Sequence, residues 1–353
     1  MKCLYVITEL WSPAGTTKFV VEMANALSAK GDRITIAIRD FGFPDQTMPN
    51  PEVEVITIKE LLGARIKERW DIVHIHGIWN YPLHQVVVWA RKYDIPIIFS
   101  PHGMLTKKAM RFKWWKKVVP WFVYQRKDCS SACLWHVTTK REEQDVRRCG
   151  FTQPCVICPL GVDIPSMGKR SPGKTRRMLF LSRVHKTKGI EDLIAAWQTT
   201  HYSNWVLTIA GPCEKKYQQK LSALVKPDVR IEFLGPVYGE DKKRIYNECD
   251  AFVLPTYTEN FGVVIAEAMA FGLPVITTYG APWECLREIG AGYWIPIGRE
   301  PLEMALSKMM ALSDEERYRM GQKGRAYVSA KFSWDVLASE LRDGYKKVLN
   351  RGS

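Results

Sequence analysis

Short apolar runs alternate with amphipathic stretches along most of the chain, and this alternation limits the fold more than any other feature. Helical spacing is clear at 18–31 and 190–198, between runs that have the apolar content of strands. Those runs fall at 2–8, 33–38, 71–76, 96–100 and 134–139, and again at 178–184, 205–211, 230–235, 251–256 and 274–278. Strands that alternate with helices form βαβ units and parallel sheets, so the sequence predicts an α/β fold.

A basic segment containing glycine and proline, GKRSPGKTRR at 168–177, separates the two series of strands. A chain of 353 residues is long enough for two domains of ordinary size. The sequence therefore predicts a doubly wound domain at 1–167, a linker at 168–177 and a second doubly wound domain at 178–331. In such sheets ligands bind beyond the carboxyl ends of the strands.

The composition restricts the cellular location and the partners. No run of eighteen uncharged apolar residues occurs, the first strand starts without a signal sequence, and the nine cysteines are odd in number and scattered. We therefore expect a cytoplasmic protein with reduced thiols. Its net charge of +14 favours anionic partners, which are phosphorylated ligands, an acidic membrane surface or nucleic acid. Because no nucleic-acid-binding motif accompanies the charge, we expect no nucleic-acid partner.

The stretch TENFGVVIAEAMAFGLP places two acids, Glu259 and Glu267, in a strand-to-helix connection. Gly262 allows a ligand to approach the backbone closely, and the amides of 260–263 lie at a predicted helix amino terminus, which favours phosphate. Glu267 falls about a turn and a half into that helix, where it could accept hydrogen bonds from the paired hydroxyls of a ribose. The alternative is that both acids are solvated, since negative charge near a helix start is mildly favourable.

A second cluster, LSRVHKTKG, follows another strand of the same predicted sheet. Arg183 supplies a planar fork of donors and Lys188 a point charge, a pair suited to closing around a diphosphate. The alternative for these cations is a solvated loop. It is weakened because this loop and the glutamate loop end strands at the same sheet edge.

These residues resemble the donor site of retaining glycosyltransferases of the GT-B fold, specifically family four. The resemblance rests on SRVHKTKG and AFVLPTYTENFGVVIAEAMAFGLPVI, and it extends in order over SPAGTTKFVVEMANALSAKG, DIVHIHG, SPHGM, CPLGVD and FSWDVLASELRDGYKKVL. It implies two Rossmann-like domains facing a cleft, with a C-terminal helix at 332–350 that packs back on the N-terminal domain.

The resemblance also implies a role for each matching residue. Arg183 and Lys188 would bind the donor diphosphate, Glu267 the ribose and Glu259 the transferred sugar, while His102 in SPHGM would contact the sugar near the reacting carbon. Family members often have paired glycines where PAGTT has one. The implied catalytic residues are His102, Glu259, Arg183 and Lys188, and the implied donor-binding residues are Gly15, Thr16, Arg183, Lys188, Glu259, Asn260, Phe261, Gly262, Val263 and Glu267.

The activity that the resemblance implies is retaining, metal-independent transfer of a sugar from a nucleotide diphosphate to an acceptor hydroxyl, without a cofactor. The departing diphosphate oxygen would take the acceptor proton while Arg183 and Lys188 stabilise its charge. The acceptor that we expect, from the family resemblance and from a basic segment described below, is a saccharide, preferably a lipid-linked one in bacterial surface polysaccharide assembly. That acceptor predicts a peripheral position at the inner face of the membrane.

Two other classes of function are weighed against this one. His74 and His76 share one face of a predicted strand, as in a two-histidine metal site, and would suit a metal-dependent hydrolase, but no acid follows in the same loop. A non-catalytic nucleotide-sugar-binding protein would use the same donor site without transfer. A structural zinc site at Cys129, Cys133, Cys155 and Cys158 is not favoured, because CVIC reads as a strand whose positions three apart face opposite ways.

One segment, KKAMRFKWWKKVVPWFVYQRK at 107–127, combines many cations and aromatic rings with no acidic residue. Cations with interfacial tryptophans suit a helix lying on an anionic membrane. The alternative is a core helix whose aromatics pack on the sheet, with a break at Pro120. We expect some rings to point inward, and the cationic face with one or two tryptophans to point outward.

Overall fold

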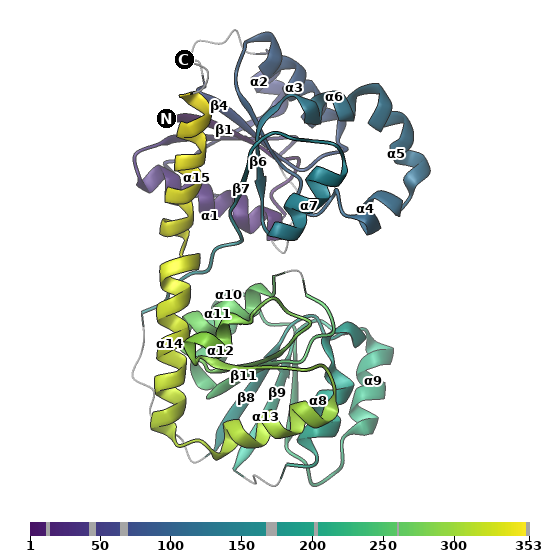
Figure 1. Cartoon of the computed structure of the whole chain (residues 1–353), viewed down its shortest axis with the longest axis vertical. Helices are drawn as coiled ribbons and strands as arrows, with labels where there is room; N and C mark the ends of the chain where they lie inside the picture. The colour runs from purple at the N-terminus through teal and green to yellow at the C-terminus, as the bar shows by residue number, and fades with distance from the viewer. Residues whose placement is uncertain are drawn as a thin grey trace. The chain divides into compact units, whose positions relative to one another are not determined.

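The computed structural model describes residues 1–11, 15–41, 47–63, 70–166, 175–200, 204–259 and 261–350. The chain divides into two compact units, each a parallel sheet covered by helices (Figure 1). The N-terminal unit comprises Met1–Gly161 and Trp334–Ser353, and the C-terminal unit comprises Val162–Ser333. The chain therefore has the predicted α/β class, with two sheets.

The sheet of the N-terminal unit has the strand order β3-β2-β1-β4-β5-β6-β7. Its strands are β1 (Lys2–Val6), β2 (Arg33–Ile38), β3 (Glu54–Thr57), β4 (Ile72–His76), β5 (Ile97–Ser100), β6 (Ala132–Val137) and β7 (Cys155–Ile157). Its helices are α1 (Gly15–Ala29), α2 (Ile58–Gly63), α3 (Tyr81–Lys92), α4 (Lys107–Arg111), α5 (Trp114–Pro120), the π-helix η1 (Trp121–Gln125), α6 (Arg126–Ser130), α7 (Lys140–Arg148) and α15 (Trp334–Leu349).

Both faces of this sheet are buried, and β1 shows how. Cys3 and Tyr5 pack in the apolar cluster that includes α1 and α15, whereas Leu4 and Val6 pack in the cluster that includes α2 and α3. A strand buried on both faces needs a continuous apolar run, because successive side chains point to opposite sides. The helix at the end of the chain therefore supplies part of the core of the first unit.

The sheet of the C-terminal unit has the order β10-β9-β8-β11-β12-β13. Its strands are β8 (Arg176–Leu181), β9 (Trp205–Ala210), β10 (Ile231–Gly235), β11 (Ala251–Leu254), β12 (Val275–Thr278) and β13 (Gly292–Ile295). Its helices are the 3₁₀-helix η2 (Lys186–Lys188), α8 (Ile190–Trp197), α9 (Lys215–Leu224), α10 (Gly239–Glu248), α11 (Val263–Ala270), α12 (Cys285–Ile289), α13 (Arg299–Ala311) and α14 (Asp314–Phe332).

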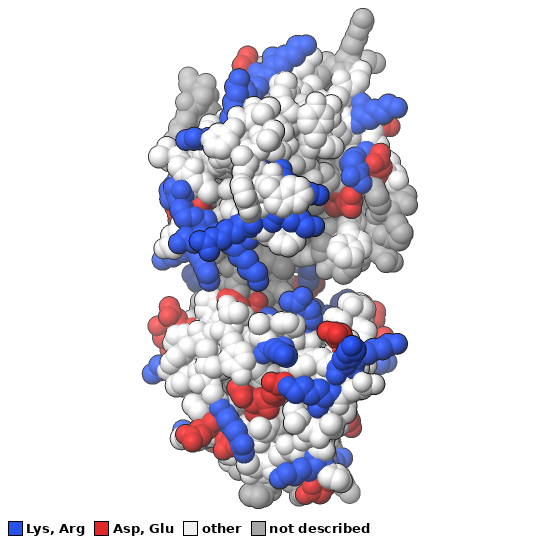
Figure 2. Space-filling view, turned by 90° about the vertical axis from the view of Figure 1, so that its right-hand side faces the viewer, with Lys and Arg blue, Asp and Glu red and all other residues white. Residues whose placement is uncertain are grey.

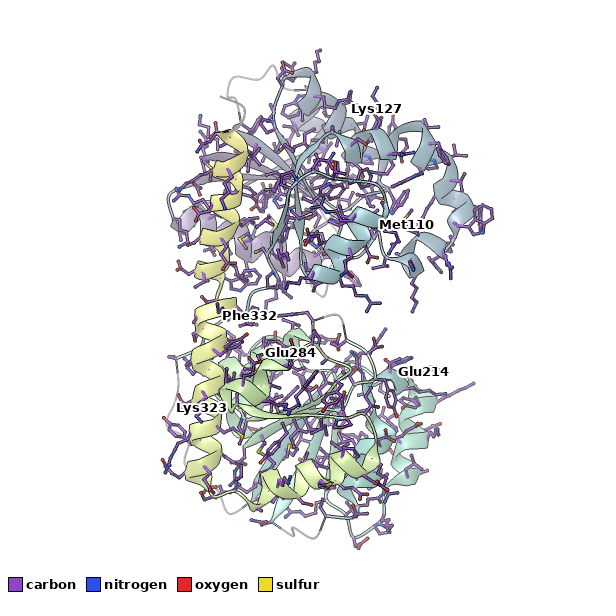
Figure 3. All side chains as sticks on the ribbon, viewed as in Figure 1. Met110, Lys127, Glu214, Glu284, Lys323 and Phe332 are labelled. Carbon is purple, nitrogen blue, oxygen red and sulfur yellow. The ribbon has the colours of Figure 1, made fainter. Side chains whose placement is uncertain are left out.

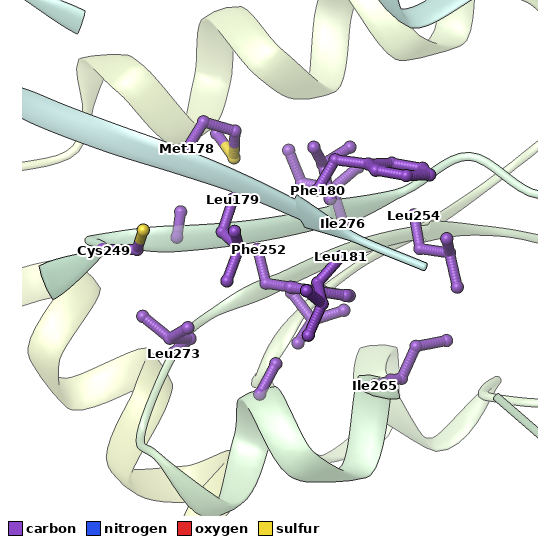
Figure 4. Packing of buried hydrophobic residues seen from close by; sticks show 14 of the residues in the cluster. Met178, Leu179, Phe180, Leu181, Cys249, Phe252, Leu254, Ile265, Leu273 and Ile276 are labelled. Carbon is purple, nitrogen blue, oxygen red and sulfur yellow. The ribbon is translucent and has the colours of Figure 1, made fainter. Parts of the chain in front are cut away.

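One apolar cluster forms the core of this unit, and β8 runs through its middle (Figure 4). Leu179 and Leu181 alternate with Met178 and Phe180 along the strand, and all four side chains are buried. Ile265 brings α11 onto the same core. This packing fixes where β8 ends, and the loop that begins there carries the predicted cations.

The unit boundaries differ from those predicted. The first unit ends at Gly161, not at residue 167, because Val162 packs in the second core and donates its N–H to the carbonyl of Phe332 at 2.8 Å. The predicted linker lies mostly outside the described residues, and its last two positions, Arg176 and Arg177, open β8 instead.

The C-terminal helix also begins later than predicted. Phe332 ends α14 and packs against the core of the C-terminal unit, Ser333 is extended, and Trp334 starts α15. Helix α15 belongs to the N-terminal unit, as predicted. Two edge strands, β3 and β13, are not among the predicted runs, because each has only four residues and is partly exposed. Within the described residues, no helix is long and apolar enough to cross a membrane.

Candidate functional site

The central strands β8 and β11 of the C-terminal unit are neighbours, and the chain leaves them toward opposite edges of the sheet. Such a point, where the strand order reverses, is where ligands bind in open parallel sheets, just beyond the carboxyl ends of the strands. The loop after β8 carries Arg183 and Lys188, and the loop after β11 carries Glu259. The fold therefore brings the two predicted clusters to one place.

Backbone contacts hold these two loops together. Tyr257 donates its N–H to the carbonyl of Thr187 at 2.9 Å, and the hydroxyl of Thr256 donates to the same carbonyl at 3.1 Å. Gly189, which follows Lys188, has a φ of +69°, and a Cβ there would lie 2.0 Å from the carbonyl oxygen of Pro255. Only glycine, which has no Cβ, allows the backbone to come this close to Pro255. The position of the neighbouring Lys188 therefore depends on glycine at residue 189.

Lys188 and Glu259 form an ion pair between the two loops, with both side chains largely shielded from solvent. Arg183 is exposed and has no hydrogen-bond or ion-pair partner among the described residues. The site therefore holds one cation that is already paired with an acid and a second cation that faces solvent.

The start of α11 has the local geometry that the sequence predicts. Gly262 is the N-cap, with a φ of +76°, and Val263 is the first helical residue. Glu259 is held by its N–H, which donates to the carbonyl of Gly280 at 2.8 Å, and the carbonyl of Phe261 accepts from the indole of Trp283 at 2.5 Å. Asn260 lies outside the described residues.

Glu267 is buried in α11, so it is not a solvated surface acid as in the alternative interpretation. Its carboxylate forms an ion pair with Lys242 at 2.6 Å and accepts a hydrogen bond from the hydroxyl of Tyr246 at 3.1 Å. Burial, together with the neighbouring Glu267, raises the pKa of Tyr246 well above its usual value, so this hydroxyl stays protonated and donates. A buried carboxylate with fixed partners is a suitable acceptor for ligand hydroxyls.

The N-terminal unit has its own reversal point, between β1 and β4, and a cluster of histidines lies there. His74 and His76 end β4, His102 follows β5 and His136 lies on β6. The ring of His76 lies with its centroid 4.1 Å from that of His74 and 5.3 Å from that of His102. Burial, and secondarily His136, lowers the pKa of His102 to about 3, so its imidazole is neutral at physiological pH.

His74 does not have the free nitrogens that a metal ligand needs. Its Nδ1 lies 2.6 Å from the hydroxyl of Tyr345, and its Nε2 lies 2.6 Å from the hydroxyl of Ser100. Among the described residues, no three His, Cys, Asp or Glu side chains form a group that could hold a metal ion. The geometry thus gives no support to the hydrolase alternative based on His74 and His76.

The remaining predicted residues lie in the same unit. Gly15 and Thr16 open α1 after β1, but a Cβ at Gly15 would meet no atom within 4 Å, so glycine is not required there by the described structure. Cys129, Cys133, Cys155 and Cys158 are free thiols, and Cys155 opens the strand β7. Burial raises the pKa of Cys129 to about 12, as expected for an inert buried thiol.

Two family models match consecutive parts of the chain. "Glycosyltransferase Family 4" matches residues 13–165, and "Glycosyl transferases group 1" matches residues 167–327. The chain belongs to this glycosyltransferase family. The predicted site residues therefore lie within the matched regions, as do both sheets except for β1 (Lys2–Val6).

Two curated relatives illustrate the likeness in sequence. An uncharacterized glycosyltransferase of Methanocaldococcus jannaschii is 33% identical over 175 residues, which are 48% of this chain and 45% of that protein. The chain thus matches less than half the length of this relative. The phosphatidyl-myo-inositol mannosyltransferase of Mycobacterium leprae is 24% identical over 371 residues, covering 97% of this chain and 95% of that protein.

A solved structure shows the same fold. Anabaena HepE, determined in complex with UDP, has a TM-score of 0.74 and 17% identity over 98% of this chain and 100% of that chain. The fold of this glycosyltransferase family member is therefore GT-B, with two Rossmann-like units.

Two residues of the site were not predicted from the sequence. Lys242 and Tyr246 lie four residues apart on α10 and both contact Glu267. Their spacing places them on one face of a helix. That helix directly precedes β11, which is the signal that could have linked them to the site of this glycosyltransferase.

Proposed function

We propose that the protein transfers a sugar from a nucleoside diphosphate sugar to an acceptor hydroxyl with retention of anomeric configuration. The observation that carries the proposal is the contact between Lys188 and Glu259 where the strand order of the C-terminal sheet reverses. A cation for a diphosphate and an acid for sugar hydroxyls lie side by side there. A nucleoside diphosphate sugar presents those two kinds of group next to each other.

Each group of the donor has a partner in this proposal. Arg183 and Lys188 bind the diphosphate, assisted by the amides at 260–263 before and at the start of α11. Glu267 accepts hydrogen bonds from the ribose, and Glu259 accepts hydrogen bonds from the hydroxyls of the transferred sugar. Lys242 and Tyr246 hold the carboxylate of Glu267 in place. The two acids then contact opposite ends of one donor.

The ion pair implies an exchange of partners on binding. In the structure the charge of Lys188 is balanced by Glu259. When a donor binds, its diphosphate replaces Glu259 as the partner of Lys188, and the released carboxylate accepts from the sugar. Binding therefore replaces one charge-assisted contact by several, each worth roughly 1.5–3 kcal/mol.

The N-terminal unit supplies the remaining groups. His102 hydrogen-bonds the transferred sugar near the reacting carbon, and Gly15 and Thr16 approach the diphosphate. A neutral imidazole suits this position, because it can hydrogen-bond the sugar without adding positive charge beside an oxocarbenium-like transition state. His102 is a hydrogen-bonding residue in this mechanism and not the general base.

The reaction proceeds at one face of the sugar. The bond from the anomeric carbon to the diphosphate oxygen breaks, the acceptor oxygen forms the new bond on the same side, and the departing diphosphate oxygen takes the acceptor proton. Arg183 and Lys188 stabilise the charge that develops on the diphosphate. We propose that these fixed cations make a metal ion unnecessary, and that no cofactor takes part.

UDP is the first nucleotide to test, because the Anabaena structure was determined in complex with UDP. For the acceptor we propose a lipid-linked saccharide of a bacterial surface polysaccharide such as O-antigen, capsule or exopolysaccharide. Two observations support a lipid: the net charge of +14 and the name of the Mycobacterium leprae relative, which includes a phosphatidylinositol. The protein would then work in the cytoplasm, peripherally bound at the inner face of the membrane.

The test measures nucleotide binding first. A nucleotide sugar at 100 times its dissociation constant should stabilise the protein by about 2.7 kcal/mol, which a thermal-shift panel detects. Arg183→Ala with Lys188→Ala should abolish the shift, whereas Lys215→Ala with Lys216→Ala, an exposed pair on α9, should leave it intact. An unchanged shift in the first variant, for UDP and GDP alike, would remove the donor site.

Transfer is then measured with and without EDTA. We expect transfer to persist in EDTA and the product to retain the anomeric configuration of the donor. Activity lost in EDTA and restored by manganese or magnesium would overturn metal independence. Donor binding without transfer to any acceptor in the panel would instead identify a non-catalytic nucleotide-sugar-binding protein.

A further inference from the structure

The helical segment between β5 and β6, residues 107–130, has an unusual outer surface. We call it the α4–α6 arm, since it comprises α4, α5, η1 and α6. Six of its large apolar side chains are each between 60% and 73% exposed, namely Phe112, Trp114, Trp115, Val119, Phe122 and Val123. Single exposed apolar residues are common, but a contiguous group of this size marks an interaction site.

The outward stripe is regular. Trp115, Val118, Val119 and Phe122 follow the spacing i, i+3, i+4 and i+7, which places them on one face of the helical path. In an ordinary surface helix that spacing marks the buried face, whereas here the stripe points to solvent. The arm is therefore amphipathic with its apolar face free.

The opposite face anchors the arm to the N-terminal unit. The ring of Trp121 packs against Trp79 at a centroid distance of 5.6 Å, and Gln125 accepts a hydrogen bond from the N–H of Trp79 at 2.7 Å. Asp128 forms an ion pair with His84 at 2.7 Å when that histidine is protonated. Met110, which Figure 3 labels on α4, packs against the same core. The arm is thus held from one side.

Pro120 is the last residue of α5 and directly precedes the π-helix η1. Proline has no N–H to donate, so the regular series of helix hydrogen bonds is interrupted there. The helical path continues in η1, whose hydrogen bonds span a wider turn. The wider turn keeps Trp121 on the inner face and Phe122 on the outer face. The predicted split of the rings between inner and outer faces is confirmed.

The arm is strongly basic. Between Asp94 and Asp128 the sequence has no acidic residue. Six Lys and Arg residues lie at 107–117, and none of them forms an ion pair with a described residue. These residues are Lys107, Lys108, Arg111, Lys113, Lys116 and Lys117. The ammonium of Lys116 lies 5.1 Å from the ring centroid of Trp115, and that of Lys113 lies 5.2 Å from that of Phe112. In Figure 2, Lys and Arg side chains gather beside uncharged surface on this side of the N-terminal unit.

We propose that the α4–α6 arm docks on an anionic lipid bilayer, with Trp114, Trp115, Val119 and Phe122 in the interface and the lysines at the headgroups. Aromatic rings next to cations suit headgroup depth, and each Lys near an anionic surface strengthens binding about fivefold. The valines favour a bilayer over nucleic acid, because aliphatic side chains do not stack on bases. A second copy of the chain would bring lysines against lysines.

The docking face is close to the proposed acceptor site in the sequence. His102 precedes the first residue of α4 by five positions, on the loop that leaves β5. Docking would hold that loop near the headgroups, where a lipid-linked saccharide is presented. The inference deepens the proposed function and rests on it for the acceptor, but the lipid contact itself is tested separately.

The experiment is cosedimentation of the full chain with vesicles of phosphatidylcholine, alone or mixed with phosphatidylglycerol. The wild type should bind the anionic vesicles at low salt, bind phosphatidylcholine alone weakly and be released at high salt. Lys108→Gln, Lys113→Gln and Lys116→Gln together should lower the partition coefficient roughly a hundredfold. Lys215→Gln with Lys216→Gln on α9 is the matched control and should bind as the wild type does.

The apolar contribution is tested by Trp115→Ser, Val119→Ser and Phe122→Ser. This variant should lose binding even at low salt, whereas Met304→Ser, which changes an equally exposed side chain on α13, should not. Quenching of tryptophan fluorescence by brominated lipid provides a measurement on the wild type alone, and Trp114→Phe with Trp115→Phe should remove most of it.

Three results would overturn the proposal. The first is that the wild type does not bind anionic vesicles at low salt, and the second is that the serine variant still binds lipid. The third is that, without lipid, the wild type self-associates or binds RNA and the serine variant does not. Nucleotide thermal shifts keep the two proposals apart. The arm variants should retain the UDP shift, and the Arg183/Lys188 variant should retain vesicle binding.

Discussion

The Nδ1 atom of His76 lies 3.0 Å from the Nε2 atom of His102, so a buried strand residue holds the ring of the loop residue that we propose contacts the sugar. The other nitrogen of His76, Nε2, is buried and has no hydrogen-bond partner among the described residues. His102 itself has a φ of +47°, a conformation that non-glycine residues seldom adopt. The contact therefore fixes the orientation of a ring on a strained backbone.

We expect His76→Phe to lower kcat roughly tenfold to a hundredfold, because the His102 ring loses its orientation. The affinity for UDP should change little, since the cations that we propose bind the diphosphate, Arg183 and Lys188, lie in the C-terminal unit. Steady-state kinetics with a UDP-sugar, compared with calorimetry of UDP, separate the two quantities. His76→Asn, whose amide can occupy the position of Nδ1, should recover part of kcat; equal losses in both variants would point to a packing role alone.

The Lys188–Glu259 ion pair gives opposite expectations for two ligands. Glu259→Gln removes the charge that balances Lys188, so free UDP should bind as tightly as before or several-fold more tightly. Turnover with the intact sugar donor should fall, because the carboxylate that we propose accepts hydrogen bonds from the sugar is missing. Calorimetry and kinetics on the same preparation check both effects, and weaker UDP binding in this variant would contradict the partner exchange.

Gly189 and Gly235 form a matched pair for testing the contact between the site loops. Their φ values are +69° and +72°. A Cβ at Gly189 would lie 2.0 Å from the carbonyl oxygen of Pro255, whereas a Cβ at Gly235 would meet no atom of the described residues within 4 Å. Gly235→Ala should cost about 1–2 kcal/mol of backbone strain. Gly189→Ala should cost more and also weaken UDP binding, since it displaces Lys188. Thermal unfolding with and without UDP measures both.

The histidine cluster makes stability depend on pH. Burial lowers the pKa of His74, His76, His102 and His136 below the ordinary value near 6.5, so the unfolded chain binds more protons than the folded chain. Their contribution to stability is complete above about pH 6.5 and is lost as the pH falls, for His102 down to about 3.

Urea unfolding should therefore show lower stability at about pH 5 than at about pH 7.5, by up to about 2 kcal/mol for each histidine. His76→Phe should reduce the difference between the two pH values, because one buried group no longer titrates. His185→Gln, at an exposed position, is the control and should leave it unchanged. A pH dependence equal in all three proteins would exclude the cluster as its source.

Local patterns predicted much of this structure because the relevant residues are close in the sequence. The apolar runs gave the central strands, and the turn at Gly262 gave the start of α11. The partners of Glu267 were not predicted because Lys242 and Tyr246 contact it from another helix. The spacing of apolar residues along the sequence does not indicate which helices pack side by side. The ion pair between Lys188 and Glu259 was likewise not predicted, because each residue was expected to contact the donor and not the other residue.

Helix α15 has a consequence for how the chain is made. Its residues Leu337, Leu341 and Tyr345 fill the core that β1 begins, and the hydroxyl of Tyr345 lies 2.7 Å from that of Tyr5. The C-terminal unit is complete within Val162–Ser333. During synthesis from the N-terminus, the ribosome therefore releases the first unit without its closing helix. The part of the chain that is translated first is the last to finish folding.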